Sequence, residues 1–256
     1  MHNLTSYNLA GKTALVTGGA SGIGLAVTTQ IARNGGTVAV NYLPDDTRGP
    51  ETIAQLQSQG LKVIGAPGNV AVAGDAERMV GQAIQDLGRL DFLHANAGTP
   101  ASRRQIQPHE LDMMTEEFWN TILQTNLLGV FRCAHAAAAA LKSSSGAIVS
   151  TASIAGINRA GSSLAYGASK AGVINMTQNL ARALAPDVRV NAVAPGAVDS
   201  SWMIEWTNEQ RSASVDRALL KRRCTTDDIA EVVLFLGFGA AMVTGQTITV
   251  DGGLTL

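Results

Sequence analysis

The sequence is poor in the residues that cross-link small domains or bind metal ions. It contains only two cysteines in 256 residues, Cys133 and Cys224, and neither belongs to a CxxC or Cys/His pattern. Widely separated cysteines of this kind argue against a disulfide framework and against a zinc site. We therefore expect no bound metal ion and a reducing environment for the protein.

An excess of one charge and long apolar runs are also missing. The chain has 19 basic and 20 acidic side chains, and its formal net charge is −1. Such a balance provides no long-range field that would attract a nucleic acid or an anionic membrane. Apolar stretches stay shorter than the ~18 residues of a membrane span, and the first residues lack the pattern of a secretion signal. We expect a cytoplasmic protein that binds neither nucleic acid nor membrane.

Short β-branched runs and longer helical patterns alternate along the chain. The runs that predict strands are TALVT, TVAV, KVIGA, DFLHA, AIVST, VRVNAVA and TITV. Helical patterns fill residues 22–34, 51–59, 72–87, 116–141, 164–185 and 227–236. Apolar strands separated by helices indicate parallel pairing with both faces of the sheet covered. We predict an α/β fold with a doubly wound, mainly parallel seven-stranded sheet and helices on both faces.

The chain shows no linker or internal repeat, so we expect a single domain over residues 1–256. Residues 197–223 follow the sixth predicted strand and fit no alternation of strand and helix. A long insertion of this kind in a compact domain is usually a lid or a binding loop. We therefore predict a lid at about residues 197–223.

A glycine-rich turn joins the first predicted strand to the first predicted helix. The sequence KTALVTGGASGIGLAV places Gly18, Gly19, Gly22 and Gly24 at this turn. Glycine lets the chain turn tightly and lets an anion approach the backbone, and a helix N-terminus adds free N–H groups. The turn predicts a phosphate cradle, although its GxxxGxG spacing meets the GxGxxG fingerprint only loosely. A merely tight connection is the alternative.

A tyrosine and a lysine lie four positions apart in the sequence YGASK, at Tyr166 and Lys170. On a helix these positions share one face, so both side chains can point into one pocket. A free phenol has a pKa of about 10, and a neighbouring ammonium group lowers it. Taken alone, a tyrosine and a lysine at this spacing more often form a solvated helix face.

Further motifs follow in a definite order. ANAG spans residues 95–98, TNLLGV contains Asn126, STASIAG contains Ser153, PGAVDS spans 195–200, and GQTITVDGG spans 245–253. Together with TGGASGIG and YGASK, and with a step of thirteen positions from Ser153 to Tyr166, they resemble the short-chain dehydrogenase/reductase family over nearly the whole chain. The resemblance implies a Rossmann-type fold and an NAD(P)-dependent oxidoreductase that interconverts a secondary alcohol and a ketone.

The same resemblance assigns four catalytic residues. Tyr166 would exchange a proton with the substrate oxygen while hydride moves between the substrate and the nicotinamide. Lys170 would tune Tyr166 and bind the ribose, and Ser153 would donate to the substrate oxygen. Asn126 would hold a water that links Lys170 to solvent. A catalytically silent nucleotide-sensing protein on the same fold is the alternative, but such a sensor has no need of this proton relay.

The resemblance also assigns the cofactor contacts. They are Gly18, Ser21, Gly22, Ile23, Gly24, Tyr42, Asn69, Val70, Asn96, Ala97, Gly98, Tyr166, Lys170, Pro195, Gly196, Val198 and Ser200. Asn69 stands where many members of the family have an aspartate that holds the adenine amino group. Ser200 replaces the threonine that binds the nicotinamide amide, and it keeps the hydroxyl.

Cofactor choice is expected at the end of the second predicted strand. NAD-dependent members usually carry an aspartate there, which binds the ribose and repels a 2′-phosphate, and this chain has Tyr42. Asp45, Asp46 and Arg48 lie on the loop beyond and act in opposite directions. Because the repelling carboxylate is missing from its usual place, we favour NADP(H) over NAD(H).

The substrate is not determined by the sequence. Trp202 and Trp206 lie one helical turn apart in the predicted lid and would cover an apolar alcohol or ketone, or else pack on the body or on a partner subunit. A 3-oxoacyl thioester and a sugar or polyol are both open. The resemblance also implies a homotetramer, with helices 116–141 and 164–185 and the C-terminal strand at its interfaces. His94 and His135 are expected to be structural.

Overall fold

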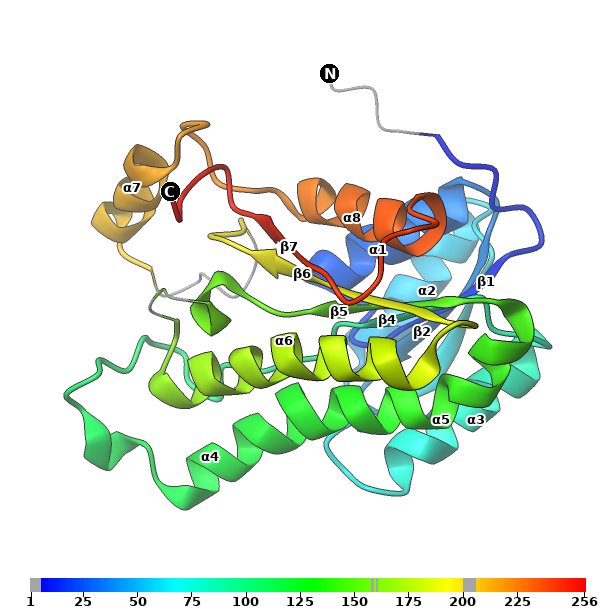
Figure 1. The fold of residues 1–256 in the computed structure, drawn as a ribbon, viewed down its shortest axis with the longest axis horizontal. Helices are drawn as coiled ribbons and strands as arrows, with labels where there is room; N and C mark the ends of the chain where they lie inside the picture. The colour runs from blue at the N-terminus through cyan, green and yellow to red at the C-terminus, as the bar shows by residue number, and fades with distance from the viewer. Residues whose placement is uncertain (1–5, 158, 160, 200–205) are drawn as a thin grey trace.

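The computed structural model describes residues 6–157, 159, 161–199 and 206–256, which form one sheet covered by helices (Figure 1). The strands are β1 Thr13–Val16, β2 Thr37–Tyr42, β3 Val63–Pro67, β4 Phe92–Ala95, β5 Ala147–Thr151, β6 Arg189–Pro195 and β7 Thr247–Val250. They pair in the order β3-β2-β1-β4-β5-β6-β7, and these pairings are all parallel. The predicted doubly wound sheet is therefore confirmed, with parallel pairing throughout.

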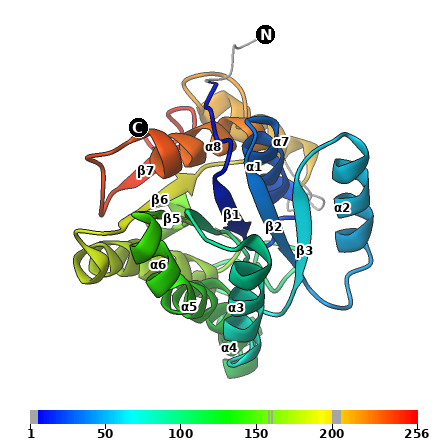
Figure 2. The ribbon, with the colours of Figure 1, turned by 90° about the vertical axis from the view of Figure 1, so that its right-hand side faces the viewer.

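Helices cover both faces of the sheet, as the end-on view shows (Figure 2). The α-helices are α1 Gly22–Arg33, α2 Arg48–Ser58, α3 Asp75–Leu87, α4 Glu116–Leu123, α5 Gly129–Ser144, α6 Leu164–Leu184, α7 Asn208–Arg217 and α8 Thr226–Leu234. Short helical turns are η1 Leu111–Met113, η2 Gln124–Leu128, η3 Ile154–Gly156 and η5 Phe235–Gly239. Helices α1 and α8 lie on one face, and α3, α5 and α6 lie on the other.

The central strands are apolar at successive positions because each face of the sheet has its own core. In β1, Ala14 and Val16 belong to the core under α1 and α8, whereas Leu15 belongs to the core under α3, α5 and α6. All three side chains are completely buried. This two-sided burial is the reason that the strand sequences do not alternate between apolar and polar residues.

Two of the predicted elements are corrected by the structure. The helix predicted over residues 116–141 is divided into α4 and α5 by the π-helical turn η2, and α5 continues to Ser144. The predicted lid region contains helix α7, which the pattern of apolar residues does not predict. Residues 200–205 of that region, including Ser200 and Trp202, lie outside the described residues.

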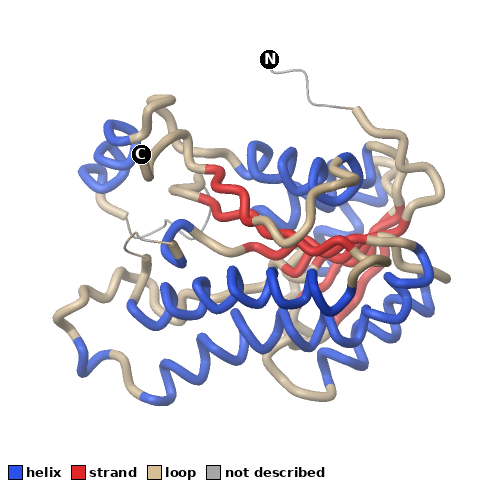
Figure 3. Tube along the Cα trace, viewed as in Figure 1, coloured by secondary structure: helices blue, strands red, loops and turns tan. Residues whose placement is uncertain are grey.

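The two ends of the sheet have different structures. Beyond the carboxyl ends of the strands, the loops gather on one side of the molecule (Figure 3). The usual ligand position of such folds is at this end, next to β1 and β4, where the chain changes direction across the sheet. Within the described part of the chain, no helix is long and apolar enough to span a bilayer.

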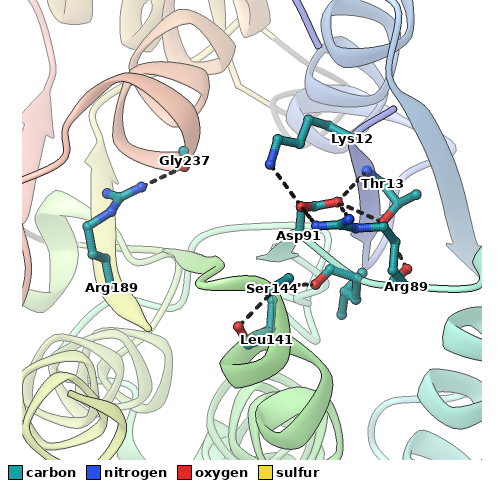
Figure 4. A network of polar contacts seen from close by, with 9 residues as sticks. Lys12, Thr13, Arg89, Asp91, Leu141, Ser144, Arg189 and Gly237 are labelled. Carbon is teal, nitrogen blue, oxygen red and sulfur yellow. Dashed lines mark hydrogen bonds and ion pairs between the residues drawn. The ribbon is translucent and has the colours of Figure 1, made fainter. Parts of the chain in front are cut away.

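The amino ends of the strands are fastened by buried polar contacts (Figure 4). Asp91 is 5% exposed and accepts hydrogen bonds from Lys12 Nζ at 3.0 Å, from the Thr13 amide at 3.0 Å and from Arg89 at 2.6 Å. Arg189 donates to the carbonyl oxygens of residues 236, 237 and 240 at the end of η5. Burial alone would raise the pKa of the Asp91 carboxyl group. The hydrogen bonds that it accepts lower the pKa by more, so the pKa lies below its ordinary value.

Candidate active site

The glycine turn forms an open cradle at the start of α1. Gly18 has φ +60° and Gly22 has φ +52°, a backbone region that favours glycine. A Cβ atom at Gly22 would meet nothing within 4 Å, whereas one at Gly24 would lie 2.2 Å from the Gly18 carbonyl oxygen. Ser21, the N-cap of α1, makes no side-chain capping bond in the described structure. The first amides of α1 are thus available to a phosphate, and the turn fits a dinucleotide.

Asn41, near the end of β2, holds this turn in place, and the sequence reasoning missed it. Its Oδ1 accepts a hydrogen bond from the Gly18 amide at 3.1 Å. Its Nδ2 donates to the carbonyl oxygens of Ala66 at 3.0 Å and Gly68 at 2.9 Å, at the end of β3. The side chain is 3% exposed. The sequence does contain a signal for this role. An asparagine inside the apolar run TVAVNY is expected to be buried, and a buried amide needs hydrogen-bond partners.

The ANAG segment connects the turn to the neighbouring strands. The amides of Asn96 and Ala97 both donate to Thr17 Oγ1 at 2.9 Å. Asn96 Nδ2 donates to the carbonyl oxygen of Thr17 at 3.0 Å. A Cβ atom at Gly98 would lie 3.3 Å from Asn126 Oδ1 and 3.6 Å from Lys170 Nζ. The structure thus places this segment between the glycine turn and two of the four predicted catalytic residues.

A second turn, at Asn69 and Val70, borders the same end of the sheet. Asn69 Oδ1 accepts the Ala71 amide at 2.9 Å, so part of this side chain closes its own turn. Arg132 on α5 donates to the carbonyl oxygens of Val70 at 3.2 Å and Ala71 at 3.1 Å. It also donates to Gln124 Oε1 at 2.6 Å. Arg132, which the sequence reasoning did not single out, therefore connects this turn to the π-helical turn η2.

Tyr42 does not place a charged group at the end of β2. A Cβ atom at Gly49 would lie 2.3 Å from the Tyr42 ring, and one at Gly65 would lie 3.2 Å from its hydroxyl. The ring therefore lies between the first turn of α2 and strand β3. Beyond it, Arg48 donates to Asp46 at 2.8 and 2.6 Å, and this bond lowers the pKa of Asp46 and raises that of Arg48.

Asn126 lies in the π-helical turn η2 and is completely buried. Its Oδ1 accepts the Thr99 amide at 2.7 Å, and its Nδ2 donates to the Thr99 carbonyl at 3.0 Å. The same Nδ2 contacts Ser169 Oγ on α6 at 3.2 Å. Asn126 thus joins the segment after β4 to the helix that carries Tyr166 and Lys170.

The remaining three predicted catalytic residues meet at the start of α6 and the end of β5. Ser163 caps α6 by accepting the Tyr166 amide at 3.1 Å. Lys170 Nζ donates to the Thr151 carbonyl at 2.7 Å and lies 5.7 Å from the centre of the Tyr166 ring. Ser153 hydrogen-bonds Tyr166, which favours the phenolate. The structure therefore brings all four predicted catalytic residues to one end of the sheet.

Burial controls the charges of this cluster. Tyr166 packs with Ile122 and Ala165, and Phe118 and Trp119 of α4 cover them. Burial raises the pKa of Tyr166 to about 12, more than the Ser153 hydrogen bond lowers it, and burial lowers the pKa of Lys170 to about 8. The expected lowering of the Tyr166 pKa is therefore wrong, because burial disfavours the phenolate more strongly than the Ser153 hydrogen bond favours it. The phenol is protonated at neutral pH.

The other predicted contacts follow β6. The Gly196 amide donates to the Val250 carbonyl at 3.0 Å, and a Cβ atom at Gly196 would lie 2.6 Å from that of Asp251. Val198 forms a β-bridge with Cys224. Pro195 ends β6 against Val250 of β7. These residues lie at the same carboxyl end of the sheet as the glycine turn.

Comparison with known proteins agrees with this geometry. A sequence family described as Enoyl-(Acyl carrier protein) reductase matches residues 18–255. The chain is 35% identical over 246 residues to the 3-oxoacyl-[acyl-carrier-protein] reductase FabG of Staphylococcus aureus, covering 95% of this chain and 98% of that protein. It is 34% identical to the FabG of Thermotoga maritima, covering 97% of this chain and 99% of that protein.

A solved structure shares the fold over the whole length. It is a short chain dehydrogenase from Burkholderia cenocepacia in complex with NADP, with a TM-score of 0.87 and 32% sequence identity. The match covers 98% of this chain and 100% of that chain.

Proposed function

This chain belongs to the short-chain dehydrogenase/reductase family of NAD(P)-dependent oxidoreductases, and from that membership we propose that it reduces the ketone of a 3-oxoacyl thioester to a secondary alcohol with NADPH. The observation that carries the proposal is the convergence of Asn126, Ser153, Tyr166 and Lys170 at one end of the sheet. Ser153 and Lys170 each contact Tyr166, and Asn126 contacts Ser169 on the same helix, which supports the assignment of these residues to one site.

The direction of the reaction is supported by the state of Tyr166. A phenol is protonated at neutral pH and burial raises the pKa of Tyr166 further, to about 12, so Tyr166 Oη holds a proton that it can give to a substrate oxygen as negative charge develops there. Ser153 Oγ donates a hydrogen bond to the same oxygen. The bound dinucleotide supplies the hydride. Asn126 joins the segment after β4 to Ser169 near the start of α6, and thereby supports the part of the helix that carries Tyr166 and Lys170.

The dinucleotide would be held by the glycine turn, the Asn69 turn and the residues after β4 and β6. We propose NADP(H) over NAD(H) because Tyr42, at the end of β2, offers no carboxylate to repel a 2′-phosphate. The NADP bound to the Burkholderia relative supports the same choice. We also propose that the chain acts as one domain, with residues 197–223 as the lid over the substrate.

The substitution Tyr166→Phe tests the catalytic assignment. We expect turnover to fall about 100-fold or more because the proton donor is removed, whereas dinucleotide affinity should change little. Turnover is followed by the nicotinamide absorbance and affinity by titration calorimetry. Tyr7→Phe is the matched control, because Tyr7 packs on the other core, under α1 and α8. An active Tyr166→Phe enzyme would contradict the assignment.

The substrate class is tested with a panel of ketones under both cofactors. A 3-oxoacyl thioester, a sugar and a cyclic ketone are each supplied with NADPH and with NADH at matched concentrations. We expect the highest kcat/KM for the thioester with NADPH. A wild-type chain that binds NADPH and reduces none of these ketones would favour the silent, nucleotide-sensing alternative.

A further inference from the structure

A histidine lies in the apolar sheet directly beneath the proposed site, where the reaction gives it no role. His94 is the third residue of β4 and is completely buried. Its ring is parallel to that of Phe92, with 6.4 Å between the ring centres. Burial lowers the pKa of His94 to about 3, so the ring is neutral at physiological pH. A neutral imidazole has one N–H donor and one bare nitrogen acceptor, and the two have different roles.

Three side chains form a short relay from this histidine to the glycine turn. His94 Nε2 lies 3.0 Å from Thr151 Oγ1, and Thr151 Oγ1 lies 3.1 Å from Asn96 Oδ1. Asn96 Nδ2 then donates to the Thr17 carbonyl at 3.0 Å and contacts the Gly18 carbonyl at 3.4 Å. The relay therefore runs from β4 through the end of β5 to the turn after β1.

The chemistry of the partners fixes every proton in this relay. Asn96 must direct its amide nitrogen to the two carbonyl oxygens, because the reverse orientation would bring oxygen against oxygen. Its Oδ1 then faces Thr151 and can only accept, so the single Thr151 hydroxyl proton is donated there. Thr151 Oγ1 must in turn accept from His94, which places the proton on Nε2. His94 Nδ1 is left bare, and it has no hydrogen-bond partner among the described residues.

We propose that His94 is a positioning residue for the dinucleotide: through Thr151 it orients the Asn96 side chain, which holds the glycine turn in its binding shape. The inference rests on the proposed function, since the turn is assigned to the dinucleotide there. The Asn96 amide lies in close contact with the turn, because a Cβ atom at Gly24 would lie 2.8 Å from Asn96 Nδ2. Thr151 also connects the relay to the catalytic lysine, because its carbonyl accepts the Lys170 ammonium.

The proton positions are tested first, on a chain with an unaltered relay. The sequence has four histidines, and the combined substitutions His2→Gln, His109→Gln and His135→Gln leave His94 as the only one. Nitrogen-15 NMR of the labelled ring at neutral pH should show the neutral form with its proton on Nε2. A proton on Nδ1, or a charged ring, would overturn the proposal without reference to cofactor or turnover.

The effect on binding is tested with a double-mutant cycle. We expect His94→Val and Thr151→Val each to raise the Kd for NADPH about tenfold, which corresponds to about 1.4 kcal/mol. If His94 acts through Thr151, the double variant should bind no more weakly than Thr151→Val alone. Thr151→Ser keeps the hydroxyl and should restore binding. Independent, multiplying effects in the double variant would overturn the proposal.

A control separates positioning from general loss of stability. Leu93→Val trims the adjacent buried residue of β4, whose side chain belongs to the opposite core, and leaves the relay intact. We expect it to lower the thermal midpoint and to leave the Kd for NADPH unchanged. An equal loss of affinity in Leu93→Val would show that His94 only supports the strand, and would overturn the proposal. If the wild-type chain does not bind NADPH, the proposed function fails, and the NMR result still decides the relay.

Discussion

Lys170 is an amine held where water does not reach it. Its side chain is 3% exposed, and its ammonium donates to a backbone carbonyl oxygen. Burial lowers its pKa to about 8. Active sites commonly contain such destabilised groups, because a perturbed pKa is useful to the reaction and is compensated by the rest of the fold. The consequence for Lys170 is a measurable dependence of stability on pH.

We expect Lys170 to increase the free energy of unfolding of the wild-type chain as the pH rises from about 8 towards 10.5. In this window the unfolded chain still holds the Lys170 proton while the folded chain has released it, so stability rises with pH. Lys170→Met should lack this gain. Urea unfolding of both proteins at several pH values across this window gives their free energies of unfolding. The difference between the two proteins isolates the contribution of Lys170, because the other titrating groups are common to both. Parallel pH dependences would contradict the expected shift.

The family resemblance assigned Asn126, Ser153, Tyr166 and Lys170 as the proposed catalytic residues, and their shared location at one end of the sheet could be expected from it. The charges of these groups could not be predicted in the same way. The raised pKa of Tyr166 is caused by burial, and Phe118 and Trp119 pack against it from α4 through the tertiary fold. Asn41 and Arg132 were missed for a related reason, since each acts on a turn that is distant in sequence.

At the scale of elements, the start of α1 packs against the turn that precedes it. Gly24 allows this approach, because a Cβ atom there would lie within 2.2 Å of the Gly18 carbonyl oxygen. Gly81 in α3 is a contrasting case, since a Cβ atom there would meet nothing within 4 Å. The same substitution should therefore have opposite effects in the two helices.

We expect Gly24→Ala to lower stability by about 1–3 kcal/mol and to weaken NADPH binding at least tenfold, because the added carbon displaces α1 from the turn. Gly81→Ala should raise stability by up to about 1 kcal/mol, because alanine favours the helix, and should leave binding unchanged. Chemical denaturation and calorimetry measure both quantities. A Gly24→Ala protein that binds NADPH normally would show that the turn tolerates a shifted helix.

The strands and most helices were predictable from apolar periodicity and glycine positions. The π-helical turn η2 was not, because its residues continue an ordinary helical pattern and only the contacts of Asn126 with Thr99 and Ser169 select it. Helix α7 has almost no apolar face, so periodicity gave no signal. Its start was readable nonetheless: Thr207 and Gln210 form a capping box.

At the scale of the whole molecule, apolar surface remains on the elements that the family resemblance assigns to subunit contacts. Phe131 on α5 is 45% exposed and stacks on His135, and Ile248 on the edge strand β7 is 37% exposed. The outer edge of β7 has no neighbouring strand in the described sheet. The homotetramer that the resemblance implies would cover these side chains and this strand edge.

We expect sedimentation to give a mass about four times the 26.5 kDa of one chain. Phe131→Asp should reduce this mass, because a carboxylate would have to be buried in the interface. Val72→Asp is the matched control, since Val72 is also exposed but lies outside α5, α6 and β7. A monomeric wild-type chain would contradict the homotetramer.

The polar contacts of Asp91 and Arg189 lie at the amino ends of the strands, opposite the proposed site, and use none of its residues. Substitutions in the loop after β4 (residues 99–115) or in the described part of the predicted lid (residues 206–223) should therefore not disturb these polar contacts. The chain is for that reason a suitable recipient for loops exchanged with relatives of different substrate range, and it should keep its architecture while its chemistry is redirected.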